Sequence, residues 1–255
     1  MLYLLLLVTV LVTSVLSGIL GMAGGMLLMA VLVFTLPVAG AMIFHGAVQM
    51  LANGSRAWFL REHIQWQILP PYLLGAGVVL ALLSLFAFVP EPGLVLIAIG
   101  ALPWLALVFK SINRMHVGDR ASAFVCGIVV TTAQLLAGVS GPLLDMFYVN
   151  APLNRHQIIA SKGLTQALGH LMKIGYYGAL LVWGMSNVET AEAFGDTQLL
   201  PLWMFAAGML MAIAGTRIGT WILERWNEAA FRSVSQKVIL AIATLCLAQG
   251  VYALL

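Results

Sequence analysis

Two stretches of this sequence place polar donors and cations inside apolar surroundings. Successive helical residues are 100° apart, so four side chains in each stretch fall within about 80° of one another. These two sets, the polar stripes, are His45, Gln49, Asn53 and Arg56, and Lys162, Gln166, His170 and Lys173. A charged side chain near a bilayer centre costs roughly 2.5–3.5 kcal/mol, so it persists where it has a partner or a function. Neither stripe has a carboxylate, and together they predict an electropositive cavity for a small oxyanion.

Two breaks rich in small residues add backbone donors to this site. "GILGMAGGM" interrupts the apolar segment 2–36, and "LAGVSGPLL" interrupts the segment 121–150. A helix that begins after such a break presents unpaired N–H groups and the positive end of its dipole, which bind anions. The complete predicted substrate-binding set is Lys162, His45, Gln49, Gln166, Gly24, Gly25, Ser140, Gly141, Lys173, Arg56, His170 and Asn53.

Three titratable residues are candidates for carrying a proton. They are His45 and His170, because histidine titrates nearest to physiological pH, and Asp145. Asp145 follows the second break, in the second arm of the segment 121–150. There its carboxylate either pairs with Lys162 or Arg155 or takes part in a proton relay. Cys126 and Cys246 lie in apolar stretches without metal-ligand spacing, so we expect neither a metal nor a cofactor.

Composition places these residues in a polytopic membrane protein. The 255 residues are 62% hydrophobic and 8% charged, with a mean hydropathy of +1.02, whereas about 25% of a typical soluble domain is charged. The net charge of +3 is small and no basic run is present, which argues against a nucleic-acid partner. The expected partners are the lipid bilayer and a small anion, and a homo-oligomer is compatible with the sequence.

The polar stripes belong to an internal repeat with an offset of 117 residues. This offset places Gly46 over Gly163 and Gln49 over Gln166. The predicted repeats are 1–117 and 118–255, within one all-α membrane domain. The first contains a hairpin at 2–36 and helices at 38–60, 70–90 and 93–112; the second contains a hairpin at 121–150 and helices at 157–183, 200–223 and 234–254.

The distribution of charge predicts that the second repeat is inverted. Each hairpin is read as a re-entrant or broken helix pair that returns to its own side, and three crossings follow it. With the N-terminus outside, the basic segments 56–61, 110–120 and 217–237 become cytoplasmic, and the outer loops "VPEPG" and "MSNVETAEAFGDTQ" contain no Lys or Arg. We therefore expect an inner-membrane protein with both termini extracytoplasmic. Such inverted repeats are typical of secondary transporters, whose substrates bind near the midplane.

At these residues the sequence resembles the TauE/SafE family of sulfite and organosulfonate exporters. The resemblance rests on "SGILGMAGGMLL" and "LAGVSGPLLDMFY", and on the helices "HGAVQMLANGSRAW" and "IIASKGLTQALGHLMKIGYY" that follow them. It covers nearly the whole chain. It implies a transporter, not an enzyme, that exports sulfite or an organosulfonate such as sulfoacetate or sulfolactate.

Two other functions fit part of the pattern. "GVSG" is similar to the G-x-S-G of rhomboid-type intramembrane proteases, with Ser140 as nucleophile and His170 as base. The repeat places Ala23 at the position equivalent to Ser140, so duplication explains the motif without a serine. Paired hairpins lined by Lys and His would also suit an anion channel.

Overall fold

Every regular element in the described part of the chain is a helix. The computed structural model describes residues 1–20, 23–112, 115–186, 200–223, 225 and 228–255. The α-helices are α1 (Leu2–Leu20), α2 (Ala23–Thr35), α3 (Val38–Phe59), α4 (Leu69–Phe86), α5 (Pro92–Ile112), α6 (Arg120–Leu136), α7 (Gly141–Tyr148), α8 (Arg155–Ser186), α10 (Leu202–Leu223) and α11 (Glu228–Tyr252). Two short 3-10 helices, η1 (Arg61–His63) and η2 (Trp66–Ile68), join α3 to α4.

Among the described residues, four helical stretches are long and apolar enough to cross a membrane. They are Leu2–Ile19, Trp66–Phe86, Pro92–Phe109 and Leu202–Ile222. These stretches and the helical content of the described residues confirm the predicted all-helical, membrane-type class. Most of the predicted outer loop "MSNVETAEAFGDTQ" lies outside the described residues.

Both over-long apolar segments divide into two helices at their small residues. The first divides between α1 and α2, and the second between α6 and α7, where Gly138 has φ +71°. Glycine adopts this left-handed conformation without the steric cost that other residues pay. The two pairs differ in length: α1 has 19 residues and is long enough to cross a membrane alone, whereas α7 has eight. The second arm is too short to cross a membrane alone in both pairs, since α2 has 13 residues and α7 has eight.

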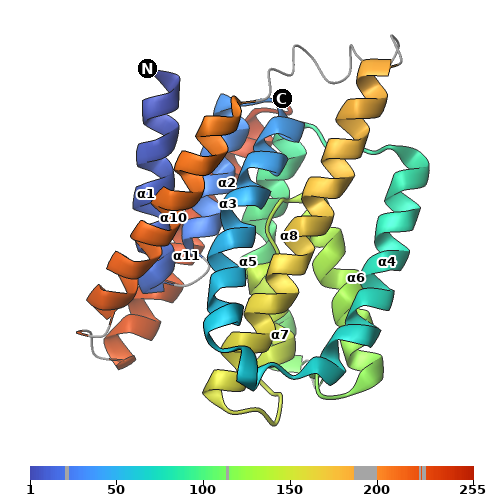
Figure 1. The fold of residues 1–255 in the computed structure, drawn as a ribbon, viewed down its shortest axis with the longest axis vertical. Helices are drawn as coiled ribbons and strands as arrows, with labels where there is room; N and C mark the ends of the chain where they lie inside the picture. Colours follow the sequence, from blue (N-terminus) through green and yellow to red (C-terminus); the bar gives the residue numbers. More distant parts are fainter. Residues whose placement is uncertain (21–22, 113–114, 187–199, 224, 226–227) are drawn as a thin grey trace.

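The two helix pairs open toward opposite ends of the molecule (Figure 1). The chain enters and leaves the α1 and α2 pair at the upper end, and the α6 and α7 pair at the lower end. Both termini lie at the upper end. The end of α3 and the beginning of α8 lie at the lower end. The two helices are therefore antiparallel, and so are the polar stripes that they carry.

The major contacts between helices join the two halves of the chain. They are α1 with α10, α3 with α8, α5 with α11, and α4 with α6. In the repeat, helices α1, α2, α3, α4 and α5 correspond in order to α6, α7, α8, α10 and α11. This correspondence converts the α1 and α10 pair into the α6 and α4 pair, and it leaves the α3 and α8 pair and the α5 and α11 pair unchanged. Exchanging the two halves therefore reproduces the same major contacts.

Glycines allow the close approach of α3 and α8 at the centre of the molecule. A Cβ on Gly46 would lie 2.8 Å from Cγ1 of Ile174 and 3.4 Å from the carbonyl oxygen of His170. A Cβ on Gly163 would lie 3.0 Å from the carbonyl oxygen of Asn53. Gly46 and Gly163, and Asn53 and His170, are each separated by the repeat offset of 117 residues. The helices cross where these positions meet, which places the polar stripes face to face.

Candidate functional site

One cavity joins the two polar stripes and both breaks. It is lined by Ser17, Gly25, Met26, His45, Gln49, Asn53, Arg56, Val139, Ser140, Gly141, Lys162, Gln166 and His170. The cavity has a volume of about 70 Å³. One water needs roughly 10–15 Å³ of such volume. The space therefore suits a small anion with a few waters. Ten of the twelve predicted binding residues line it, and Gly24 and Lys173 do not.

Three donors that line the cavity have no partner in the described part of the protein. The amides of Gln49 and Gln166 and the guanidinium of Arg56 make no hydrogen bond or ion pair to any described residue. Asn53 differs, because its Nδ2 donates to the carbonyl oxygen of Gln49 at 2.9 Å. Gln49 is buried, and a buried polar group without a partner costs about 1–3 kcal/mol, whereas Gln166 and Arg56 are partly buried. These donors are consequently available to water or to a ligand.

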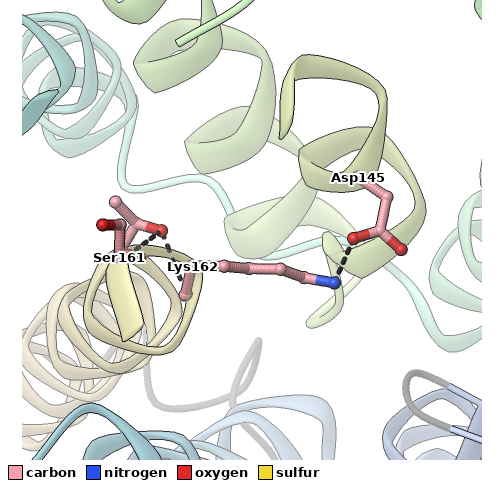
Figure 2. A network of polar contacts seen from close by, with 4 residues as sticks. Asp145, Ser161 and Lys162 are labelled. Atoms are coloured by element: carbon pink, nitrogen blue, oxygen red, sulfur yellow. Dashed lines mark hydrogen bonds and ion pairs between the residues drawn. The ribbon is translucent and has the colours of Figure 1, made fainter. Parts of the chain in front are cut away.

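Lys162 reaches across from α8 to pair with Asp145 on α7 (Figure 2). Of the two partners that the sequence leaves open for Asp145, the structure gives it Lys162. The side chains are 21% and 41% exposed, so the pair lies at the edge of the cavity. Asp145 balances the charge of Lys162 while the cavity is empty. Arg56 then lines the cavity with no carboxylate partner among the described residues.

Lys173 and Gly24 do not line the cavity but contact residues that lie next to it. Lys173 is 0% exposed, and its Nζ lies 2.9 Å both from Nδ1 of His45 and from the carbonyl oxygen of Gly138. Gly24 faces the first arm of its own hairpin, because a Cβ there would lie 1.9 Å from the carbonyl oxygen of Thr13. Lys173 therefore holds His45, and Gly24 permits the contact between α1 and α2.

A buried chain of hydrogen bonds through Gln134, which the sequence analysis missed, joins Ser140 to His170. The Ser140 hydroxyl donates to Oε1 of Gln134 at 2.6 Å, and Nε2 of Gln134 donates to Nδ1 of His170 at 2.7 Å. Gln134 stands 117 residues after Ser17, which lines the cavity. Polar residues at equivalent places in two apolar arms are a signal that could have identified both. An amide oxygen cannot take a proton as a general base does, so this contact does not activate Ser140 as a nucleophile.

Replacing Ser140 by alanine is expected to weaken anion binding less than about tenfold, since one net hydrogen bond contributes roughly 0.5–1.5 kcal/mol. Anion-dependent thermal stabilisation of purified protein measures this. Ser55→Ala is the matched control, because the Ser55 hydroxyl donates only to the carbonyl oxygen of Ala52 in its own helix. Cleavage of a membrane peptide by the wild type that disappears in Ser140→Ala would instead favour the protease.

Comparison with family models, with curated proteins and with solved structures found no match to this chain.

Proposed function

We propose that this protein is a secondary transporter that exports a small sulfur-containing anion, sulfite or an organosulfonate, through the cell inner membrane. The observation that carries the proposal is the single cavity lined by both polar stripes and by residues of both breaks. Its unpartnered donors come from α3 and α8, one helix in each half of the chain. A ligand bound there contacts both halves at once.

The donor set favours an anion with several oxygens. Arg56 presents a planar fork of N–H donors, which matches paired oxygens. Gln49 and Gln166 add amide donors, and Lys162 adds a second cation at the edge. A sulfonate or sulfite has three oxygens and fits a space that holds only a few waters. The choice of sulfur over other oxyanions comes from the resemblance to the TauE/SafE family.

Alternating access by two inverted repeats accounts for the arrangement of the helices. Three features support it: the helix pairs open toward opposite ends, exchange of the halves reproduces the major contacts, and equivalent glycines meet where α3 crosses α8. Rocking one repeat against the other around the cavity would expose it to each side in turn. In this topology both termini are extracytoplasmic.

Thermal stabilisation of the purified protein tests the proposed substrate class. The panel is sulfite, sulfate, sulfoacetate, taurine, sulfolactate, acetate and phosphate. A ligand that binds only the folded state at 100 times its Kd stabilises it by about 2.7 kcal/mol. We expect sulfite or a sulfonate to raise the melting temperature, and acetate and phosphate to leave it unchanged. Equal stabilisation by phosphate, or none by any member, would contradict the proposal.

Counterflow in proteoliposomes then separates a transporter from a channel. A transporter loaded with unlabelled anion accumulates labelled anion transiently, because each turnover carries one bound ligand across. A channel dissipates the gradient without this overshoot. We expect the overshoot for the anion that stabilises the protein best.

A further inference from the structure

Lys173 and His45 form a buried pair that bridges the two breaks next to the cavity. Nε2 of His45 lies 2.9 Å from the carbonyl oxygen of Gly25, and Nδ1 of His45 lies 2.9 Å from Nζ of Lys173. Nζ of Lys173 lies 2.9 Å from the carbonyl oxygen of Gly138. The exposed fractions of His45 and Lys173 are 1% and 0%. One unbroken chain of hydrogen bonds therefore runs from the first break to the second.

The carbonyl oxygens at both ends fix where the hydrogens lie. A carbonyl oxygen only accepts, so Nε2 of His45 carries a hydrogen and donates to Gly25. In the neutral imidazole Nδ1 is then an acceptor, and Lys173 donates to it and to Gly138. These two bonds use the two hydrogens of a neutral amine. The pair is consequently fully hydrogen-bonded without any charge.

The same geometry accepts one added proton and no more. The proton can lie on Nζ of Lys173 or on Nδ1 of His45, because either group donates to the other across the 2.9 Å contact. A second proton would set an N–H of His45 directly against an ammonium group with no lone pair between them. The pair therefore has two protonation states, which differ by one positive charge.

The protein itself supplies little to balance that charge. Titratable and charged side chains, apart from those in the terminal turns of the helices, lie on α3 and α8, which carry the pair, and on four of the helices around them. Helix α2 has none. These side chains are His170, Lys162, Tyr176 and Tyr177 on α8, Arg56 on α3, Asp145 and Tyr148 on α7, Cys126 on α6, Tyr72 on α4 and the exposed Arg217 on α10. Asp145 is the one carboxylate among them, and it pairs with Lys162. An uncompensated buried charge costs several kcal/mol, so the pair is neutral while the cavity is empty.

His170 lies beside the pair but does not share this behaviour. The rings of His45 and His170 have centroids 5.5 Å apart. Nδ1 of His170 accepts from Nε2 of Gln134, whose Oε1 is held by the Ser140 hydroxyl. This orientation of the amide keeps His170 neutral, with a hydrogen on Nε2. The added proton therefore belongs to Lys173 and His45.

We propose that Lys173 and His45 bind one proton when an anion enters the cavity, so that proton and anion cross the membrane together. The inference rests on the proposed function. His45 lines the cavity, so the negative charge of a bound anion lies next to the pair and replaces the missing counter-charge. A monovalent anion then crosses with no net charge. Net movement would follow the sum of the concentration gradients of the anion and the proton, and the membrane potential would neither assist nor oppose it.

Proton uptake on anion binding tests this coupling in the full-length protein. Calorimetric titration with methanesulfonate at pH 7.5, in two buffers of different ionisation enthalpy, yields the number of protons taken up. Methanesulfonate is fully ionised at this pH, so any proton is bound by the protein. We expect uptake of about one proton per anion for the wild type. In Lys173→Met we expect weaker binding without uptake, and in His45→Asn weaker binding with reduced uptake, because Lys173 is still present to bind the proton.

The control variant is Lys237→Met, which removes an exposed lysine of α11 and is expected to bind the anion and take up the proton as the wild type does. Binding without proton uptake by the wild type overturns the coupling and leaves the proposed function standing. Undiminished uptake by a folded Lys173→Met protein also overturns it. Absence of binding by the wild type overturns the sulfonate site, and the coupling with it. The wild-type measurement decides the matter even if both variants fail to fold.

Discussion

Replacing Lys162 by alanine is expected to lower anion affinity about tenfold or more, since a hydrogen bond to a charged group contributes at least about 1.5 kcal/mol. The variant removes a cation from the cavity and leaves the Asp145 carboxylate at its edge without a partner. That carboxylate then repels the incoming anion. Thermal stabilisation by the best anion of the panel, titrated over concentration, measures the loss.

Replacing Asp145 by asparagine separates the two contributions, because it changes charge with little change of shape. It frees Lys162 for the anion, and we expect binding to become about tenfold tighter, equivalent to 1.4 kcal/mol. Added salt should reduce both effects, since the two side chains are 21% and 41% exposed. Equal affinities in the wild type and both variants would show that the anion binds elsewhere.

Replacing Gly24 by alanine is expected to prevent normal folding, whereas the same change at Gly25 should leave a folded protein. The Cβ at Gly24 would lie 1.9 Å from the carbonyl oxygen of Thr13 and 2.6 Å from the amide nitrogen of Ser17. These are backbone atoms of α1, so the whole helix must move. The cost lies at or above the upper end of the roughly 1–3 kcal/mol typical of overpacking.

Gly25 is the neighbouring control. A Cβ there would meet the flexible side chain of Gln49 at 3.4 Å, which can give way. Because Gly25 and Gln49 line the cavity, we expect Gly25→Ala to fold and to bind the anion less tightly. Gly40→Ala adds a control in open space, where an added Cβ meets nothing within 4 Å. Size-exclusion profiles and melting temperatures of the three variants measure the difference. A Gly24→Ala protein as stable as the wild type would contradict the packing described for α1 and α2.

Hydropathy and turn residues located most helices closely, because both are local properties of the chain. The segment expected at 38–60 is α3, Val38–Phe59, and that expected at 93–112 is α5, Pro92–Ile112. The segment 70–90 ends early, at Phe86, because Ala87 adopts a left-handed conformation before "VPEPG". Helix α11 begins at Glu228 rather than at residue 234, since a helix can continue through charged residues that hydropathy excludes.

The site was predictable as a set of residues but not as a set of contacts. Helical spacing selected seven of the residues that line one cavity, and the two small-residue breaks selected three more. The partner of Asp145, the place of Lys173 behind His45 and the contribution of Gln134 all depend on how α6, α7 and α8 pack, which no local pattern specifies. Gly24 shows the same limit, since a glycine that approaches a ligand and one that approaches a helix look alike in sequence.

The pairing of α1 with α10 has a consequence for biosynthesis. A Cβ on Gly18 would lie 2.7 Å from the carbonyl oxygen of Thr216, so the first helix packs closely against one synthesised about 200 residues later. At roughly 5–20 residues per second, the ribosome needs on the order of 10–40 seconds to reach it. During that interval α1 has its packing face turned to lipid or to the insertion machinery. A ribosome that stalls before α10 would leave an inserted but incomplete chain, which membrane quality control would have to remove.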